Sequence, residues 1–236
     1  MINTRSFASS ILVAAFLAPL IYAQDLSRYR EFQFGASLPA VTKQVQMKPS
    51  EAKAIHQRPV VIQELEWQAQ DRLTPTRQVD SVKSILFSFY NGELFRILVA
   101  YDPARTEGMT ADDIIEDVSV KYGTATKPVA EITLSSTSLY SDGEKIISNR
   151  SEKVLARWED EHYSYNLIQS PYQTSFNLVM YSKRLDALAR AAIVEAIRLD
   201  EQEVPQRELA RQKKKDDEER AKQEKARLLN KKLFRR

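Results

Sequence analysis

The sequence contains no cysteine, and this absence excludes several kinds of chemistry at once. Without a thiol the chain can form no disulfide, no catalytic cysteine and no metal site built on thiolates. Lipoprotein anchoring through a cysteine is excluded for the same reason. Histidine is nearly as scarce, because only His56 and His162 are present. Isolated histidines are usually surface residues, so we expect neither His56 nor His162 to be catalytic.

Glycine is also rare, with five residues in 236, too few and too scattered to build a loop that cradles phosphate. The chain has no HExxH, GxSxG, GxGxxG or P-loop motif. The densest acidic cluster is Asp112, Asp113, Glu116 and Asp117, which could offer oxygens to a cation. Acids at the start of a helix more simply complement its macrodipole. We therefore predict no catalytic residue, no cofactor and no metal site.

The first 24 residues, MINTRSFASSILVAAFLAPLIYAQ, have the pattern of a signal peptide. A basic start with Arg5 precedes an apolar run over residues 11–22, and Ala23 is small enough for the cleavage site. We expect cleavage between Ala23 and Gln24 and an exported protein, with the bacterial periplasm as its location. An uncleaved membrane anchor is the alternative, although the run is shorter than the ~20 residues that span a bilayer.

Charge is distributed unevenly along the chain. Residues 206–236 contain 13 Lys/Arg and 6 Asp/Glu, a net charge of +7, whereas residues 24–205 have a net charge of −5. The overall charge of +3 therefore hides an acidic body followed by a basic tail.

The first half of the body predicts helices and a hairpin. Short helices are expected after Ser37 and over residues 48–58, and a half-buried strand over residues 60–68. Asn91-Gly92 then joins two apolar strands, residues 81–90 and 93–102, as a type I′ turn would. This pairing sets Phe89 against Leu94 and Phe87 against Arg96, which leaves Arg96 unexplained on an apolar face.

The second half repeats this order. A helix is expected over residues 110–122, capped by Thr110 with Asp113, with Val120 on its apolar side. A strand at residues 129–136 and a polar loop at 137–152 should follow. Three short strands come next, KVLARWED, HYSYNLIQS and SFNLVMYSK, and a tight turn would pair Trp158 with Tyr163.

The two halves suggest a diverged internal duplication. Each runs from a glycine, Gly35 or Gly108, through a capped helix to a strand ending in Trp67 or Trp158, and then to a hairpin. The tryptophans could stack on a ligand, but their phase places them on the face that we assign to the core. Both faces of the first hairpin are largely apolar, so we expect it inside a covered sheet.

A change to helical spacing after residue 183 predicts a helix over residues 184–204 that docks on the sheet and ends before Pro205. The charged tail, residues 205–236, has no apolar stripe, and we expect it to be a partly helical, solvated extension. Three interpretations stay open for the tail. It is an inert solvated segment, it contacts anionic lipid or cell wall through LLNKKLFRR, or it binds nucleic acid, which is the least favoured of the three.

The predicted fold class is α+β. We expect two tandem modules, each a helix with an antiparallel sheet, over residues 24–105 and 106–183, then the docking helix and the charged tail. This layout resembles the β-lactamase-inhibitor-protein-like fold of outer-membrane assembly lipoproteins of the SmpA/OmlA type, over residues 32–182. Those lipoproteins are anchored through a cysteine, which this chain lacks. The segment YSKRLDALARAAIVEAIRLD also resembles a group of uncharacterised exported bacterial proteins. The resemblance implies protein binding and assigns no functional residue.

One polar face of the second sheet is a candidate contact surface. It includes Arg157, Asn166 and Tyr181, which we name as partner-contact residues, although a plain solvated face would look the same. The expected function is that of an exported, non-enzymatic module that binds another envelope or exported protein. The alternative is a small-ligand-binding protein or a hydrolase that uses carboxylates.

Overall fold

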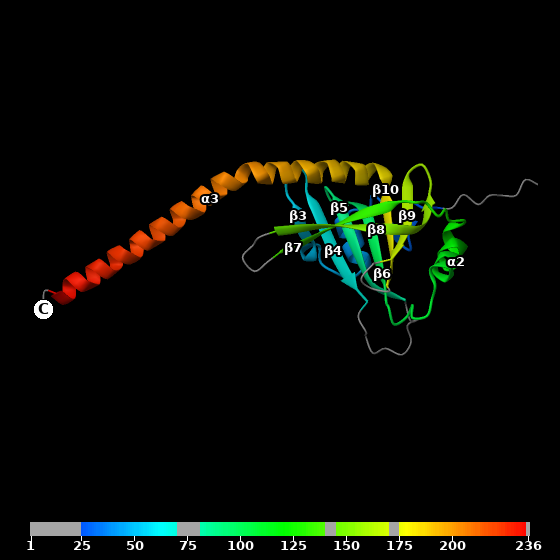
Figure 1. Ribbon diagram of the computed structural model, residues 1–236, viewed down its shortest axis with the longest axis horizontal. Helices are drawn as coiled ribbons and strands as arrows, with labels where there is room; N and C mark the ends of the chain where they lie inside the picture. Colours follow the sequence, from blue (N-terminus) through cyan, green and yellow to red (C-terminus); the bar gives the residue numbers. More distant parts are fainter. Residues whose placement is uncertain (1–24, 70–80, 140–144, 170–174, 235–236) are drawn as a thin grey trace, which may run out of the picture.

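A computed structural model describes residues 25–69, 81–139, 145–169 and 175–234. The expected signal peptide and its cleavage site lie outside these residues. The described chain forms one eight-stranded antiparallel sheet in the order β3-β4-β5-β6-β10-β9-β8-β7, with helices on its faces and a long helix projecting from it (Figure 1). The predicted α+β class is confirmed.

The helical elements are α1 (Leu38–Gln44), the short 3-10 turn η1 (Pro49–Glu51), α2 (Ala111–Tyr122) and α3 (Lys183–Phe234). A small separate hairpin joins β1 (Arg28–Tyr29) to β2 (Phe32–Gln33). The strands of the main sheet are β3 (Lys53–His56), β4 (Ile62–Gln68), β5 (Val82–Tyr90), β6 (Glu93–Tyr101), β7 (Glu131–Leu139), β8 (Lys145–Glu159), β9 (Tyr163–Gln169) and β10 (Phe176–Ser182).

The strand order is symmetric about its centre. Strands β3 to β6 follow α1, strands β7 to β10 follow α2, and the two sets meet where β6 pairs with β10. Trp67 on β4 and Trp158 on β8 therefore occupy equivalent strands, as a duplicated module would place them.

The main core lies between the sheet and the shorter helices. Helix α1 contributes Leu38 and Val41, and α2 contributes Ile114, Val118 and Tyr122 at a spacing of four residues. Sheet residues facing them include Leu65, Phe87, Ile97, Trp158, Tyr165 and Leu178. Both tryptophans belong to this core, as predicted, although Trp67 is only partly buried.

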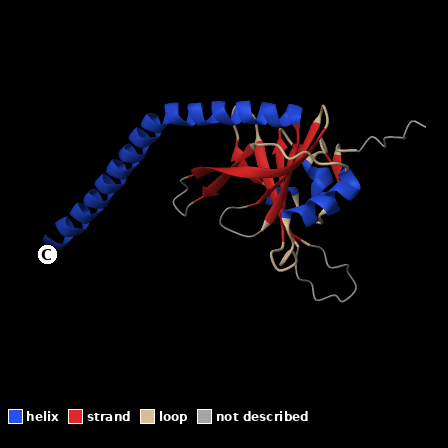
Figure 2. Ribbon diagram, turned by 45° about the vertical axis from the view of Figure 1, so that its right-hand side comes forward, coloured by secondary structure: helices blue, strands red, loops and turns tan. Residues whose placement is uncertain are grey.

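The opposite face of the sheet is covered by two elements. The first part of α3 packs Leu185 and Ala189 against Ile62 and Phe95, so the predicted docking helix is confirmed. Beside it, the β7–β8 hairpin folds over the central strands, and its Ile132 joins a cluster with Val154, Ile168 and Val179. In Figure 2 the long helix and the two short helices lie on different sides of the strands.

The helix predicted over residues 48–58 is wrong. Only a single turn, η1, forms there, and the chain continues as strand β3 paired with β4. An available sheet edge outweighs a weak local helix propensity. As part of this strand His56 is buried, contrary to the surface position that we expected.

The Asn91-Gly92 hairpin forms as predicted, but its register changes after two pairs. Phe89 pairs with Leu94, and a bulge at Phe95 then sets Ser88 against Arg96 and Phe87 against Ile97. Since the extra residue moves Arg96 to the other face of the sheet, the predicted Phe87–Arg96 pair is wrong.

Three expectations for the second half need correction. The segment predicted as a polar loop, residues 137–152, is strand wherever it is described, because β7 and β8 pair along their length. Trp158 pairs with Tyr165 rather than Tyr163, because the β8–β9 turn is longer than assumed. Val120 is exposed, because α2 buries only one narrow side.

We expected the docking helix to end before Pro205, and this is wrong. Helix α3 continues through Pro205 to Phe234. It bends partway along its length (Figure 1), and a proline inside a helix, which removes one backbone hydrogen bond, accounts for such a bend. Among the described residues, none of the helices combines the length and the apolar composition that a membrane span requires.

Candidate functional site

The predicted contact residues lie on the sheet face that α3 and the β7–β8 hairpin partly cover. Strand pairing sets Arg157 opposite Asn166, and Tyr181 lies in the neighbouring row of the same face. The Nε of Arg157 donates a hydrogen bond of 2.7 Å to the side-chain oxygen of Asn166. Asn166 is 0% exposed, so it can position Arg157 but cannot itself reach a partner. Arg157 and Tyr181 are partly exposed.

A buried ionic cluster occupies the same face beneath α3. Asp186 accepts hydrogen bonds from Arg96, whose Nε lies 3.2 Å from one carboxylate oxygen, and from the Nε of Arg190 at 2.6 Å. Asp186 and Arg96 are both largely buried. On β4, burial raises the pKa of Glu64, and the charge of Arg96 acts in the opposite direction. These contacts hold α3 on the sheet and explain Arg96, which the sequence analysis had placed without explanation on an apolar face. Their partners were not predictable because the bulge changes the face of the sheet on which Arg96 lies.

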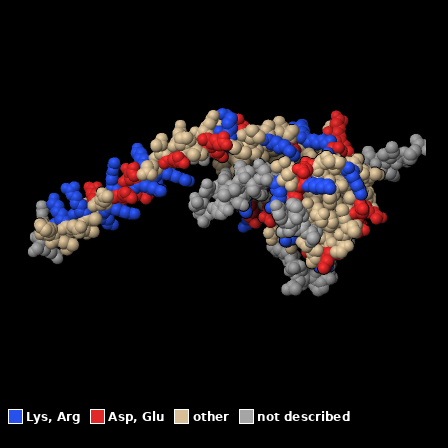
Figure 3. Space-filling view, in the orientation of Figure 1, with Lys and Arg blue, Asp and Glu red and all other residues tan. Residues whose placement is uncertain are grey.

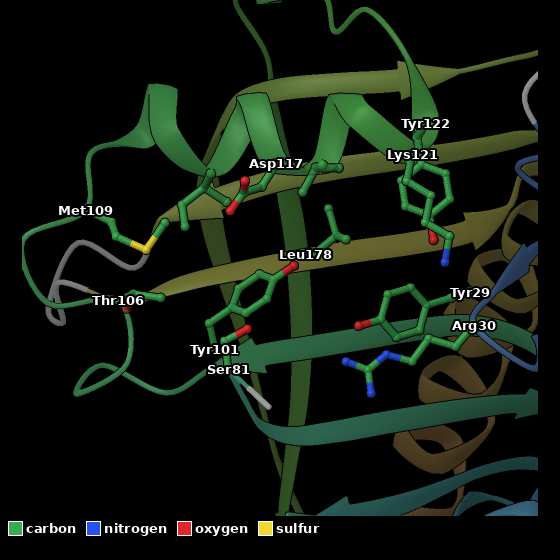
Figure 4. A pocket seen from close by; sticks show the side chains of 12 residues that line it. Tyr29, Arg30, Ser81, Tyr101, Thr106, Met109, Asp117, Lys121, Tyr122 and Leu178 are labelled. Atoms are coloured by element: carbon green, nitrogen blue, oxygen red, sulfur yellow. The ribbon is translucent and has the colours of Figure 1, made fainter. Parts of the chain in front are cut away.

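A cavity of about 300 Å³ lies on the other side of the sheet, beneath α2 (Figure 4). It is bounded by the β1–β2 turn, the end of β6, the loop before α2, and strand β10. Its lining residues are Tyr29, Arg30, Ser81, Tyr101, Thr106, Met109, Ile114, Asp117, Val118, Lys121, Tyr122 and Leu178.

The two ends of the cavity differ in charge. At one end Arg30 and Lys121 lie beside Tyr29 and Tyr122, each cation just over 5 Å from the ring centre of its neighbouring tyrosine. Burial raises the pKa of Tyr122 to about 12, and the charge of Arg30 acts in the opposite direction. Asp117 lies nearer the other end (Figure 4).

Two hydrogen bonds from the core fix the walls of the cavity. The indole N–H of Trp158 donates to the backbone oxygen of Gly123 at 2.7 Å, which anchors the end of α2 to β8. The hydroxyl of Tyr165 donates to the backbone oxygen of Arg28 at 2.7 Å, which anchors the β1–β2 hairpin. Rings of Tyr165 and Tyr122 meet edge to face at 4.8 Å, so the cationic end rests on a rigid aromatic base.

Two of the four acids in the α2 cluster have structural partners. Asp113 completes the predicted capping box, since its carboxylate accepts from the N–H of Thr110 at 2.7 Å. Asp112 pairs with Lys127 at 2.7 Å. Nowhere in the described residues do three or more His, Asp or Glu side chains lie together as a metal site would need.

The charged tail has two parts with different charge, and we call them the shaft, residues 206–224, and the tip, residues 225–236, of which α3 includes those up to Phe234. The shaft contains seven Lys/Arg and six Asp/Glu, whereas the tip contains six Lys/Arg and no acid. Figure 3 shows acidic and basic side chains mixed along the shaft. At the tip Leu229, Leu233 and Phe234 are 56%, 68% and 95% exposed.

The sequence pointed to the tip through LLNKKLFRR but gave no signal for the cavity. The cavity takes its residues from four separate segments, none of which has a motif of its own. Comparison with protein-family models, with curated proteins and with solved structures found no match to this chain.

Proposed function

We propose that this protein is an exported, non-enzymatic component of the bacterial envelope that attaches to an anionic membrane surface through the tip of α3. The body is then free to bind another envelope or exported protein, with Arg157 and Tyr181 as contact candidates. The observation that carries this proposal is the composition of the tip, which combines exposed apolar side chains with six Lys/Arg and no acidic residue.

The arrangement of the tip residues suits an interface between water and lipid. Leu229 and Leu233 are one turn apart and share a side of the helix, whereas Arg227 and Lys231 share another side. Burial of a leucine contributes about 1.5–3 kcal/mol when complete. Each Lys or Arg near an anionic surface adds about 1 kcal/mol. Together these contributions are sufficient for reversible attachment.

The shaft explains why the tip rather than the whole tail makes the contact. Its charges nearly cancel, so its attraction to an anionic surface is small. At 1.5 Å per residue, the 52 residues of α3 measure about 78 Å along the helix axis, and about half of this length projects beyond the body (Figure 1). The shaft therefore acts as a spacer that holds the body away from the membrane.

Vesicle co-sedimentation tests the attachment. The purified protein should sediment with vesicles of phosphatidylglycerol but not with vesicles of phosphatidylcholine, and the binding should weaken in high salt because the charges are exposed. Replacing Leu229 and Leu233 by serine should weaken binding more than ten-fold, because both side chains would otherwise leave water. Leu209→Ser is the matched control, since Leu209 is equally exposed but lies on the shaft.

Equal sedimentation with both vesicle types, or normal binding by the Leu229→Ser/Leu233→Ser variant, would contradict the proposal. A third outcome would replace it with a protein partner. In that case the protein ignores both kinds of vesicle, and removal of residues 206–236 abolishes cross-linking to one specific envelope protein.

Export is tested separately by the mass of the protein isolated from its host. We expect a mature chain that begins at Gln24, because Ala23 supplies the small residue that signal peptidase requires. Intact-mass spectrometry decides the matter, and a chain that retains residues 1–23 in full would show that the leader is not cleaved.

A further inference from the structure

The cavity beneath α2 lies in the body, apart from the tip of the tail, and it has the features of a ligand site. Its volume, about 300 Å³, lies at the lower end of the range for small-molecule sites. We propose that it binds a small molecule with an apolar or aromatic body and one anionic group, such as a carboxylate. This inference does not depend on the proposed function of the tip.

The body of the ligand would rest on apolar and aromatic side chains. Leu178 on β10 forms the floor, and Ile114 and Val118 of α2 close one wall. Tyr101 and Met109 line the end away from the two cations (Figure 4). Such a lining favours flat or flexible hydrocarbon and offers tyrosine hydroxyls for orientation.

The anionic group would lie between Arg30 and Lys121. These cations come from two segments far apart in the sequence, the β1–β2 turn and the last turn of α2, and they flank the same pair of tyrosines. Neither side chain is buried, so each can move to meet a ligand. Asp117 stands nearer the other end, where it would repel a second negative charge (Figure 4). The site is therefore suited to one anionic group at one end of the ligand.

The backbone at Arg30 supports a role for its side chain. Arg30 has φ of +55°, in the left-handed region, where glycine, asparagine and aspartate are the residues that fit with least strain. An arginine in this tight turn is therefore a poor choice for the turn alone. Unfavourable backbone conformations of this kind concentrate at functional sites.

Two fluorescent probes test both halves of the proposal. Anilinonaphthalene sulfonate has an aromatic body and one anionic group, and phenylnaphthylamine has the same rings without the charge. Titration of the purified protein should show saturable binding of both probes with one site each. The sulfonate should bind more tightly, because a hydrogen-bonded charge pair adds to the burial of the rings.

Variants at the rim separate charge from packing. Arg30→Asn combined with Lys121→Gln should weaken binding of the sulfonate about ten-fold and leave the uncharged probe unchanged. Lys43→Gln removes one exposed cation from α1 and is the control for a general loss of positive charge. Arg30→Asn should fold at least as stably as the parent, since asparagine suits the left-handed turn.

A filling variant locates the probes. Met109→Trp should reduce binding of both probes, because the larger side chain occupies one end of the cavity. Two results would overturn the proposal: sulfonate binding that survives the paired substitution at Arg30 and Lys121, or binding of both probes that survives Met109→Trp. Equal thermal midpoints across the series exclude misfolding as the cause of any loss.

Discussion

Replacement of Asp186 by alanine is expected to lower the free energy of unfolding by about 3–5 kcal/mol, which is the usual cost of removing one partner from a buried ion pair. Asp186 is 4% exposed, and it is the carboxylate that both Arg96 and Arg190 contact. Without it, the guanidinium of Arg96 stays largely buried and loses the carboxylate that it contacts directly, with Glu64 as the other acid within its field. Urea denaturation monitored by circular dichroism measures this loss of unfolding free energy.

Two further variants identify the cause of that loss. Glu195→Ala removes an exposed ion pair with Arg198 from the same helix and should leave the free energy of unfolding almost unchanged, because water and salt screen exposed pairs. Replacing Arg96 by methionine together with Asp186 by leucine should recover much of the stability, because an apolar pair of similar volume leaves neither partner of this ion pair buried without the other. Burial already raises the pKa of Glu64, and loss of the Arg96 charge should raise it further. If the double variant were as unstable as Asp186→Ala, loss of packing rather than an unpaired charge would be responsible.

Arg96 also shows how far local sequence signals determine this sheet. The turn at Asn91-Gly92 was predicted because both residues accept positive φ, and they have φ of +48° and +83°. The bulge at Phe95 was not predictable from the hairpin alone. Phe95 leaves the ladder because it packs against Leu185 of α3, almost a hundred residues later in the chain. Register therefore depended on a tertiary contact that no local pattern contains.

The same reason explains the β7–β8 hairpin and the cavity. The segment 137–152 is polar and has no clear alternation, yet its described residues, 137–139 and 145–152, form strands because β7 and β8 pair with each other. The cavity is assembled from the β1–β2 turn, β6, α2 and β10, and each contributes one or a few ordinary side chains. In contrast, the caps of α2 and the helical spacing of α3 are local signals, and both elements were predicted.

The second large effect is expected at Trp158. Trp158→Ala should lower the free energy of unfolding by about 3–5 kcal/mol, because it leaves a cavity beneath α2 and removes the hydrogen bond to Gly123. Trp67→Ala removes the tryptophan of the equivalent strand and should cost less, about 1–3 kcal/mol, since Trp67 is only partly buried. The comparison measures how much Trp67 and Trp158, which lie on equivalent strands of the sheet, differ in their contribution to stability.

Trp158→Phe separates packing from hydrogen bonding. Phenylalanine keeps most of the buried ring but cannot donate to the Gly123 oxygen, so we expect a loss of about 1–3 kcal/mol. Amide hydrogen exchange should then rise selectively in α2, because that hydrogen bond ties its C-terminal end to β8. Uniform exchange across the sheet, with α2 no more affected than α1, would mean that Trp158 supports the core in general. In that case packing of the apolar side of α2, without the Trp158 hydrogen bond, would hold α2 in place as the wall of the candidate ligand cavity.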